Sequence, residues 1–97
     1  MIVDFADSGT EDVWDGTNSR AARRTCPEEV WPIARRKLDM LHAAVRLGDL
    51  ASPPANHLEK LKGSLAGKHS IRVNKQYRVV FEWDGANARE VAVVDYH

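Results

Sequence analysis

The sequence predicts an α+β fold, in which N-terminal helices pack on one face of a small, mainly antiparallel β-sheet. In the first half, apolar residues recur at three- and four-residue spacing between about residues 27 and 47, which is typical of a helix. In the second half, residues 69–83 alternate between apolar and polar types and are rich in β-branched and aromatic side chains. Helical signals therefore precede strand signals, and 97 residues are sufficient for a single domain spanning residues 1–97.

The first segment, MIVDF at residues 1–5, is predicted to be a short strand that pairs into the sheet formed later in the chain. SGTEDVWDG, residues 8–16, indicates one or two helical turns, with Thr10 as the cap and Gly16 as the end. Residues 17–25 are polar and basic, and we interpret them as a connection or a short helix.

The main helix is predicted to end near Leu47, with Gly48 as its natural stop. It is preceded by residues 25–28, Thr-Cys-Pro-Glu, which match a capping box, and Pro27 is tolerated in a first helical turn. The apolar stripe that faces the core consists of Trp31, Ala34, Leu38, Leu41 and Val45. Because Pro32 costs an internal hydrogen bond, we expect a single turn before it and a kink or fresh start at Pro32.

The connection from the main helix to the sheet is predicted to be irregular. Two consecutive prolines make residues 49–56 a loop. In the HLEKLKG segment that follows, Leu58 and Leu61 are expected to anchor the chain in the core at a strand edge. Residues 64–68 are predicted to form a second loop before the hairpin.

A β-hairpin from His69 to Trp83 is predicted from the period-two spacing of apolar residues on both sides of a polar break at residues 74–76. A third strand, VAVVDYH at residues 91–97, follows a turn at residues 84–87. Three antiparallel strands fit here, and each leaves one face for chemistry. The polar residues on or beside these strands are Arg72, Asn74, Arg78, Asp95, Tyr96 and His97.

The composition excludes several kinds of protein. The hydrophobic share of 43% is ordinary for a soluble globular protein, and no stretch is long and apolar enough to span a bilayer, so a cytoplasmic protein without a membrane partner is expected. A single cysteine, Cys26, rules out an internal disulfide and a cysteine-cluster metal site, and we predict no metal and no cofactor. The net charge is zero, but residues 59–78 are locally basic, which can attract phosphate or can simply be a solvated surface.

Three motifs keep their order towards the C-terminus: LKG, then SIRVNKQYRVVFEW, then a final DYH. On these motifs the chain resembles the HigB-type toxins of the RelE superfamily of bacterial toxin–antitoxin systems. TEDVWDG, AARR and PEEVWPIARRKLDML are also similar to that family, so the resemblance covers nearly the whole chain. It implies a small RelE-like α+β fold whose curved sheet carries the active site on its concave face.

The resemblance implies a ribosome-dependent mRNA endonuclease, an mRNA interferase that cuts mRNA in the A site of the 70S ribosome. It also implies neutralisation by a HigA-like helix-turn-helix antitoxin, through which operator DNA is contacted only indirectly. Such cleavage is metal-independent, because the ribose 2′-hydroxyl attacks the adjacent phosphate while the protein moves two protons and stabilises the added charge.

Matched by position, the active-site residues of the family fall on Lys62, Asn74, Arg78, Asp95, Tyr96 and His97. Glu59 stands where some relatives have a catalytic histidine, so either Glu59 takes the acid–base role or His97 and Tyr96 act without it. We assign His97 proton donation to the leaving oxygen, because imidazole titrates near neutral pH. The predicted RNA contacts are Lys68, Arg72, Asn74 and Lys75.

Structural interpretations compete with these assignments. Arg78 can form a cross-strand ion pair with Glu82 or Glu90. Asn74 is a common turn residue, so its contact with substrate rests on the resemblance. The alternative function is a catalytically degenerate toxin that binds its antitoxin and modulates transcription, which Glu59 and the acidic N-terminus favour.

Overall fold

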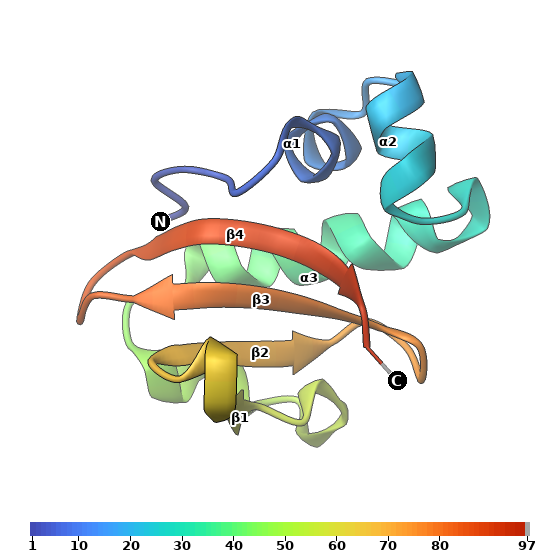
Figure 1. The fold of residues 1–97 in the computed structure, drawn as a ribbon. Coiled ribbons are helices and arrows are strands. Elements are labelled where there is room, and N and C mark those ends of the chain that lie inside the picture. Colours follow the sequence, from blue (N-terminus) through green and yellow to red (C-terminus); the bar gives the residue numbers. More distant parts are fainter. Residues whose placement is uncertain (97) are drawn as a thin grey trace.

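A computed structural model describes residues 1–96 of the chain, and the predicted catalytic His97 lies outside the described residues. Within residues 1–96, three α-helices pack with a four-stranded antiparallel sheet in the order β1-β2-β3-β4, and Figure 1 shows the sheet bowed along its strands. The helices are α1 (Ser8–Asp15), α2 (Arg20–Thr25) and α3 (Trp31–Ala43). The strands are β1 (Glu59–Lys60), β2 (Lys68–Arg72), β3 (Tyr77–Trp83) and β4 (Ala88–Asp95). The predicted fold class is therefore confirmed.

Helix α1 begins earlier than the sequence indicated. Asp7 is the N-cap, and its Oδ1 accepts a hydrogen bond from the Thr10 backbone N–H at 2.7 Å, so the prediction of Thr10 as the cap is wrong. The Thr10 side chain is instead buried, and its Oγ1 accepts a hydrogen bond of 3.0 Å from the Val93 N–H of β4. The predicted end of the helix is confirmed, since Gly16 takes the left-handed conformation with φ 80°.

Helix α3 starts where the prolines predicted but ends sooner. A single 3₁₀ turn, Glu28–Val30, precedes α3, and Pro32 lies in the first turn, where its missing N–H costs nothing. The predicted end near Leu47 is wrong, because the helix stops at Ala43 and Val45 is 74% exposed instead of facing the core. The Asp49 carboxylate accepts hydrogen bonds from two backbone N–H groups after the helix, at 3.0 Å each, and starts the 3₁₀ turn Leu47–Ala51.

The region between α3 and the hairpin contains more order than the predicted loops. It forms two further 3₁₀ turns, Pro54–Asn56 and Gly63–Leu65, and the short strand β1. Leu61 is buried and Leu58 packs against the core, as expected for an anchored strand edge.

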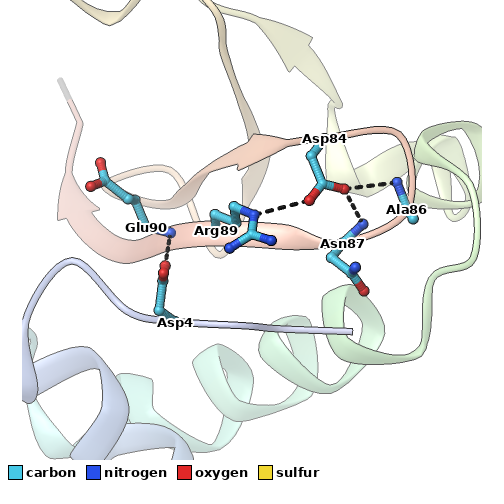
Figure 2. A network of polar contacts seen from close by, with 6 residues as sticks. All are labelled: Asp4, Asp84, Ala86, Asn87, Arg89 and Glu90. Atoms are coloured by element: carbon cyan, nitrogen blue, oxygen red, sulfur yellow. Dashed lines mark hydrogen bonds and ion pairs between the residues drawn. The ribbon is translucent and has the colours of Figure 1, made fainter.

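The hairpins follow the predicted alternation. In the β2–β3 ladder, Ile71 pairs with Val79 and Arg72 pairs with Arg78. The β3–β4 turn is closed by the Asp84 side chain, which accepts hydrogen bonds from two backbone N–H groups of the turn and from Arg89 Nε at 2.9 Å (Figure 2). Because the turn is this short, β4 begins at Ala88 and not at residue 91.

The predicted N-terminal strand is reduced to two isolated parallel bridges beside β4, Ile2 with Ala88 and Phe5 with Val91. Between them, the Asp4 carboxylate accepts a hydrogen bond of 2.6 Å from the Glu90 N–H, as Figure 2 shows. The Asp4 side chain therefore binds a backbone N–H of β4 that would donate to a backbone carbonyl if residues 1–5 formed a continuous strand.

The hydrophobic core lies between the helices and one face of the sheet (Figure 1). Fully buried members are Val13, Ala34, Leu38, Leu41, Ile71, Val79, Phe81 and Val91. In β3, Tyr77, Val79 and Phe81 belong to this core, so strand alternation turns Arg78 and Val80 to the other side. We call that side, which carries Ser70, Arg72, Arg78 and Val80, the distal face.

Candidate functional site

Arg78 is the centre of the distal face. It is only 7% exposed, although it carries a charge. Its Nε donates to Ser70 Oγ at 2.7 Å, and its Nη2 donates to the backbone carbonyls of His57 and, at 3.4 Å, of Ser70. Three acceptors on one edge of the guanidinium therefore hold this side chain against the sheet.

Two residues that the sequence placed in the site also lie beside the guanidinium. Nη1 lies 3.9 Å from Glu59 Oε1, and the guanidinium carbon lies 5.7 Å from the centre of the Tyr96 ring. Strands β1 and β3 and the chain after β4 thus bring three predicted catalytic residues together. The predicted ion pair of Arg78 with Glu82 or Glu90 is wrong, because Glu90 pairs with Lys68 at 3.5 Å and β1 supplies Glu59 instead.

Arg72 lies directly opposite Arg78 in the β2–β3 ladder. Like charges opposite each other across an antiparallel pair are destabilising unless something compensates them. Within residues 1–96, Arg72 forms no ion pair, and the partner of Arg78 is a carboxylate whose side chain is 49% exposed. The two arginines therefore make this part of the distal face an electropositive surface suited to an anion.

Three further residues predicted for the site, two of them RNA contacts and one a catalytic residue, lie in the segments that border strands β1, β2 and β3. Asn74 Oδ1 accepts hydrogen bonds of 2.8 Å from the N–H groups of Gln76 and Tyr77, so the side chain builds the β2–β3 turn. Lys75, in the same turn, is exposed. Lys62 is exposed in the segment between β1 and the 3₁₀ turn Gly63–Leu65.

Asp95 lies apart from the cluster of Arg78, Glu59 and Tyr96. It pairs with Tyr77, whose side chain faces the core, so the Asp95 side chain points to the helix side of the sheet. Burial first, and the Asp95 carboxylate second, raise the pKa of Tyr77, in agreement with the pairing of these two residues across β3 and β4. Asp95 also accepts a hydrogen bond of 3.0 Å from Gln76 Nε2 and lines an open pocket of about 390 Å³ beside α1 and α2.

Sequence reasoning missed the groups that hold Arg78 in place. Ser70 is fully buried, and only the strand register shows that it lies next to Arg78. His57 contributes a backbone carbonyl, which every residue possesses, so no pattern could identify it. The neighbouring Asn56 is buried, and it fixes this segment by donating to the Leu50 and Ser52 carbonyls while accepting from Lys37 Nζ at 2.6 Å.

Cys26 is not arranged as a nucleophile. Its side chain is buried, and this burial raises the pKa of the thiol from 9.0 to about 11. A thiol with a raised pKa forms little thiolate at neutral pH, so the interpretation of Cys26 as a bystander agrees with its surroundings.

His69 makes stability depend on pH. Its ring stacks near Phe81, and its Nδ1 is buried without a hydrogen-bond partner in the described part of the chain. Burial, and next the charge of Lys60, lower the pKa of His69 from 6.5. Below pH 6.5 the unfolded chain therefore binds a proton that the folded chain resists, and stability falls as the pH drops.

When the pH is lowered from about 7.5 to about 5.5, we expect Tm to fall less in His69→Phe than in the wild type, because the variant lacks this proton uptake. The measurement is Tm by circular dichroism at both pH values. His57→Asn, which replaces an exposed histidine in the left-handed conformation, is the control and should keep the wild-type loss. Equal losses in His69→Phe and wild type would contradict this role of His69.

Residues 1–96 contain neither a metal-binding cluster nor a membrane-spanning helix. No three His, Cys, Asp or Glu side chains of residues 1–96 lie in an arrangement that could hold a metal ion. No helix of that part of the chain has the length and apolar character needed to cross a membrane.

A family model and a similar curated protein point to the same family. The model of the family described as RelE-like toxin of type II toxin–antitoxin system HigB matches residues 4–97. Toxin HigB-1 of Vibrio cholerae is 40% identical over 83 residues, which cover 86% of this chain and 84% of that protein. An uncharacterized protein of Haemophilus influenzae is 47% identical over 58 residues, which cover 60% of this chain and 57% of that protein.

Solved structures confirm the fold. A chain of the YoeB-YefM complex from Staphylococcus aureus superposes with a TM-score of 0.60 at 16% identity, over 100% of this chain and 98% of that chain. A heterotetrameric YoeB-YefM toxin–antitoxin complex from the same organism gives a TM-score of 0.59 at 18% identity, with the same coverage. At 16% and 18% identity, this similarity is evidence only for the arrangement of helices and strands.

Proposed function

This chain belongs to the RelE-like HigB toxins of type II toxin–antitoxin systems, and from this we propose that it cleaves mRNA in the A site of the 70S ribosome. The observation that carries the proposal is the buried guanidinium of Arg78, which lies opposite Arg72 and beside Tyr96 on the distal face. The family makes the chain a toxin, and this surface supplies groups that can bind and cut RNA.

A phosphate is the anion that this surface suits. Burying a guanidinium is costly, and an ion pair of 3.9 Å with a half-exposed carboxylate compensates little of that cost. A phosphate oxygen can accept charge-assisted hydrogen bonds from Nη1 of Arg78, and a second oxygen can pair with Arg72. Tyr96 offers an aromatic face on which a base can stack, which is a common mode of recognising single-stranded RNA.

The proposed chemistry uses the ribose as its own nucleophile. The 2′-hydroxyl attacks the adjacent phosphorus, the bond to the 5′-oxygen breaks, and a 2′,3′-cyclic phosphate forms without a metal ion. In this proposal Glu59, which lies 3.9 Å from Arg78 Nη1, accepts the 2′-hydroxyl proton, and His97 donates a proton to the leaving 5′-oxygen. Arg78 stabilises the negative charge that the phosphate gains in the transition state.

The other predicted residues act around this centre in the proposal. Lys62 supplies a second cation for the phosphate. Asp95 lies on the helix side of the sheet, so in the proposal it acts from outside the Arg78 cluster, by orienting His97 two residues later in the chain. The other RNA contacts in the proposal are Lys68, Asn74 and Lys75, together with Arg72, which pairs with the phosphate. The ribosome holds the mRNA, which explains how a protein with zero net charge can act on a polyanion.

The proposed partner that stops this activity is a HigA-like helix-turn-helix antitoxin, which also provides the link to operator DNA. The family description names a type II toxin–antitoxin system, and the similar Staphylococcus aureus structures are toxin–antitoxin complexes. The proposed site of action is the cytoplasm, where the ribosomes are.

Primer extension on purified, programmed 70S ribosomes tests the proposal with the full chain. We expect the wild type to cut within the A-site codon and His97→Ala to cut at least about 100-fold more slowly, since general acid–base catalysis contributes roughly 10²–10⁴. Equal cutting by both proteins would keep the function and move proton donation away from His97. Absence of cutting by folded wild type would instead favour the catalytically degenerate antitoxin-binding module.

A further inference from the structure

The guanidinium of Arg78 is divided into two functionally different edges. Its Nε and Nη2 groups carry three of the five N–H donors, and these meet Ser70 Oγ, the Ser70 carbonyl and the His57 carbonyl. Its Nη1 group carries the other two, and the Glu59 oxygen beside them is 3.9 Å away, beyond hydrogen-bonding distance. One edge is therefore occupied by the protein, whereas Nη1 makes no hydrogen bond within residues 1–96 and has two N–H groups that a ligand could use.

We propose that Ser70 is a positioning residue for RNA cleavage, whose hydroxyl holds Arg78 so that only Nη1 faces the scissile phosphate. The proposal rests on the proposed function, because it concerns how that same site binds its phosphate. Ser70 itself touches no RNA, since its side chain is fully buried beneath the guanidinium.

The position of Ser70 in the sheet explains why it can do this. Ser70 pairs with Val80, and Arg72 pairs with Arg78, so Ser70 and Arg78 are diagonal neighbours across the β2–β3 ladder. The short side chain of serine brings its oxygen to 2.7 Å from Nε, within hydrogen-bonding distance. Alanine at this position would leave the buried Nε–H without its acceptor.

The Nη2 end of this guanidinium edge is held by residues that lie outside strands β2 and β3. The His57 carbonyl accepts from Nη2, and His57 is held in the left-handed conformation with φ 44°. Asn56 and Lys37 anchor that segment to α3. With Nη2 and Nε both fixed, rotation about the last side-chain bonds of Arg78 is blocked, and the direction of Nη1 is determined before RNA arrives.

Steady-state kinetics of cleavage on programmed ribosomes, which give kcat and KM, separate positioning from mere stability. We expect Ser70→Ala to lower kcat roughly 10- to 100-fold with KM nearly unchanged, because a small misplacement of a charge-stabilising group costs about this much. Ser70→Thr keeps the hydroxyl and should retain most of the activity. Ser64→Ala, at an exposed serine, is the matched control and should cleave as the wild type does.

A double-mutant cycle gives the decisive comparison. In an Arg78→Lys background, which keeps a cation but has no Nε–H for Ser70, adding Ser70→Ala should cost nothing further. A purely structural Ser70 would lower the rate by the same factor in both backgrounds, and that result would overturn the proposal. Wild-type kcat in the Ser70→Ala single variant would overturn it as well.

A measurement without RNA separates this proposal from the proposed function. The Arg78 Nε–H signal in an NMR spectrum should be protected from solvent exchange in the wild type and should exchange rapidly in Ser70→Ala. If the wild type fails to cleave, the proposed function fails, and unchanged protection in Ser70→Ala would then separately refute the role of Ser70 in holding Arg78.

Discussion

Arg78→Met is expected to lower the rate of A-site cleavage by about 100-fold or more, because removing one group that stabilises transition-state charge costs on the order of 10²–10³ in kcat. Methionine fills much of the space of the arginine stem, so it limits the cavity that alanine would leave in this buried position. The rate is measured by primer extension on programmed ribosomes, and circular dichroism at the assay temperature verifies folding.

Arg89→Met is the matched control for this experiment. Arg89 is also an arginine of the sheet, but it is exposed on β4 and pairs with Asp84 at the far turn (Figure 2). An ion pair at the surface contributes little to stability, so this variant should fold and cleave as the wild type does. Full cleavage by folded Arg78→Met would refute the assignment of phosphate binding to Arg78.

Gly9→Ala is expected to destabilise the protein by about 2 kcal/mol, which for a chain of this size lowers Tm by roughly 10 °C. A Cβ at Gly9 of α1 would lie 2.1 Å from Thr25 Oγ1 and 2.6 Å from the Ala21 carbonyl oxygen of α2. Thr25 can rotate away, but the Ala21 carbonyl belongs to the backbone of α2, so the two helices must move apart. Helix propensity alone predicts the opposite sign, since alanine favours helix over glycine by about 1 kcal/mol.

Gly48→Ala is the control that separates the steric clash between α1 and α2 from the general effect of replacing a glycine with alanine. A Cβ at Gly48 has no atom within 4 Å, so the change should alter stability by less than about 0.5 kcal/mol. Thr25→Ala combined with Gly9→Ala should recover only part of the loss, because the contact with Ala21 remains. Thermal melts of the four proteins test this, and a Gly9→Ala protein as stable as Gly48→Ala would show that α1 and α2 adjust freely.

Local patterns predicted most of the elements. The alternation in residues 69–83 predicted β2, β3 and the distal face, because period-two spacing directly reports which side chains share a side of a strand. The prolines predicted the interrupted start of α3. The end of α3 was misjudged because the apolar spacing continued to Val45, whereas Asp49 binds the backbone after Ala43 and competes with a further helical turn.

The candidate site was predictable only in part. The resemblance indicated Arg78, Tyr96 and Glu59, and the structure brings these three together. It also indicated Asp95, which lies on the other side of the sheet, beside Tyr77. Motif order states which residues follow one another in the chain, but it does not state which face of a strand each of them occupies.

The fold class, the family and the presence of a basic hairpin all follow from the amino-acid sequence, because these depend on local spacing and on motif order. Only the tertiary structure decided how Arg78 is held. The register of β2 against β3 places Ser70 beside Arg78, and the segment before β1 supplies the His57 carbonyl from 21 residues away. These contacts join residues that are remote in the chain. The His57 contact uses a backbone carbonyl, a group that every residue has, so the sequence cannot single it out. Both contacts become visible only once the chain is folded.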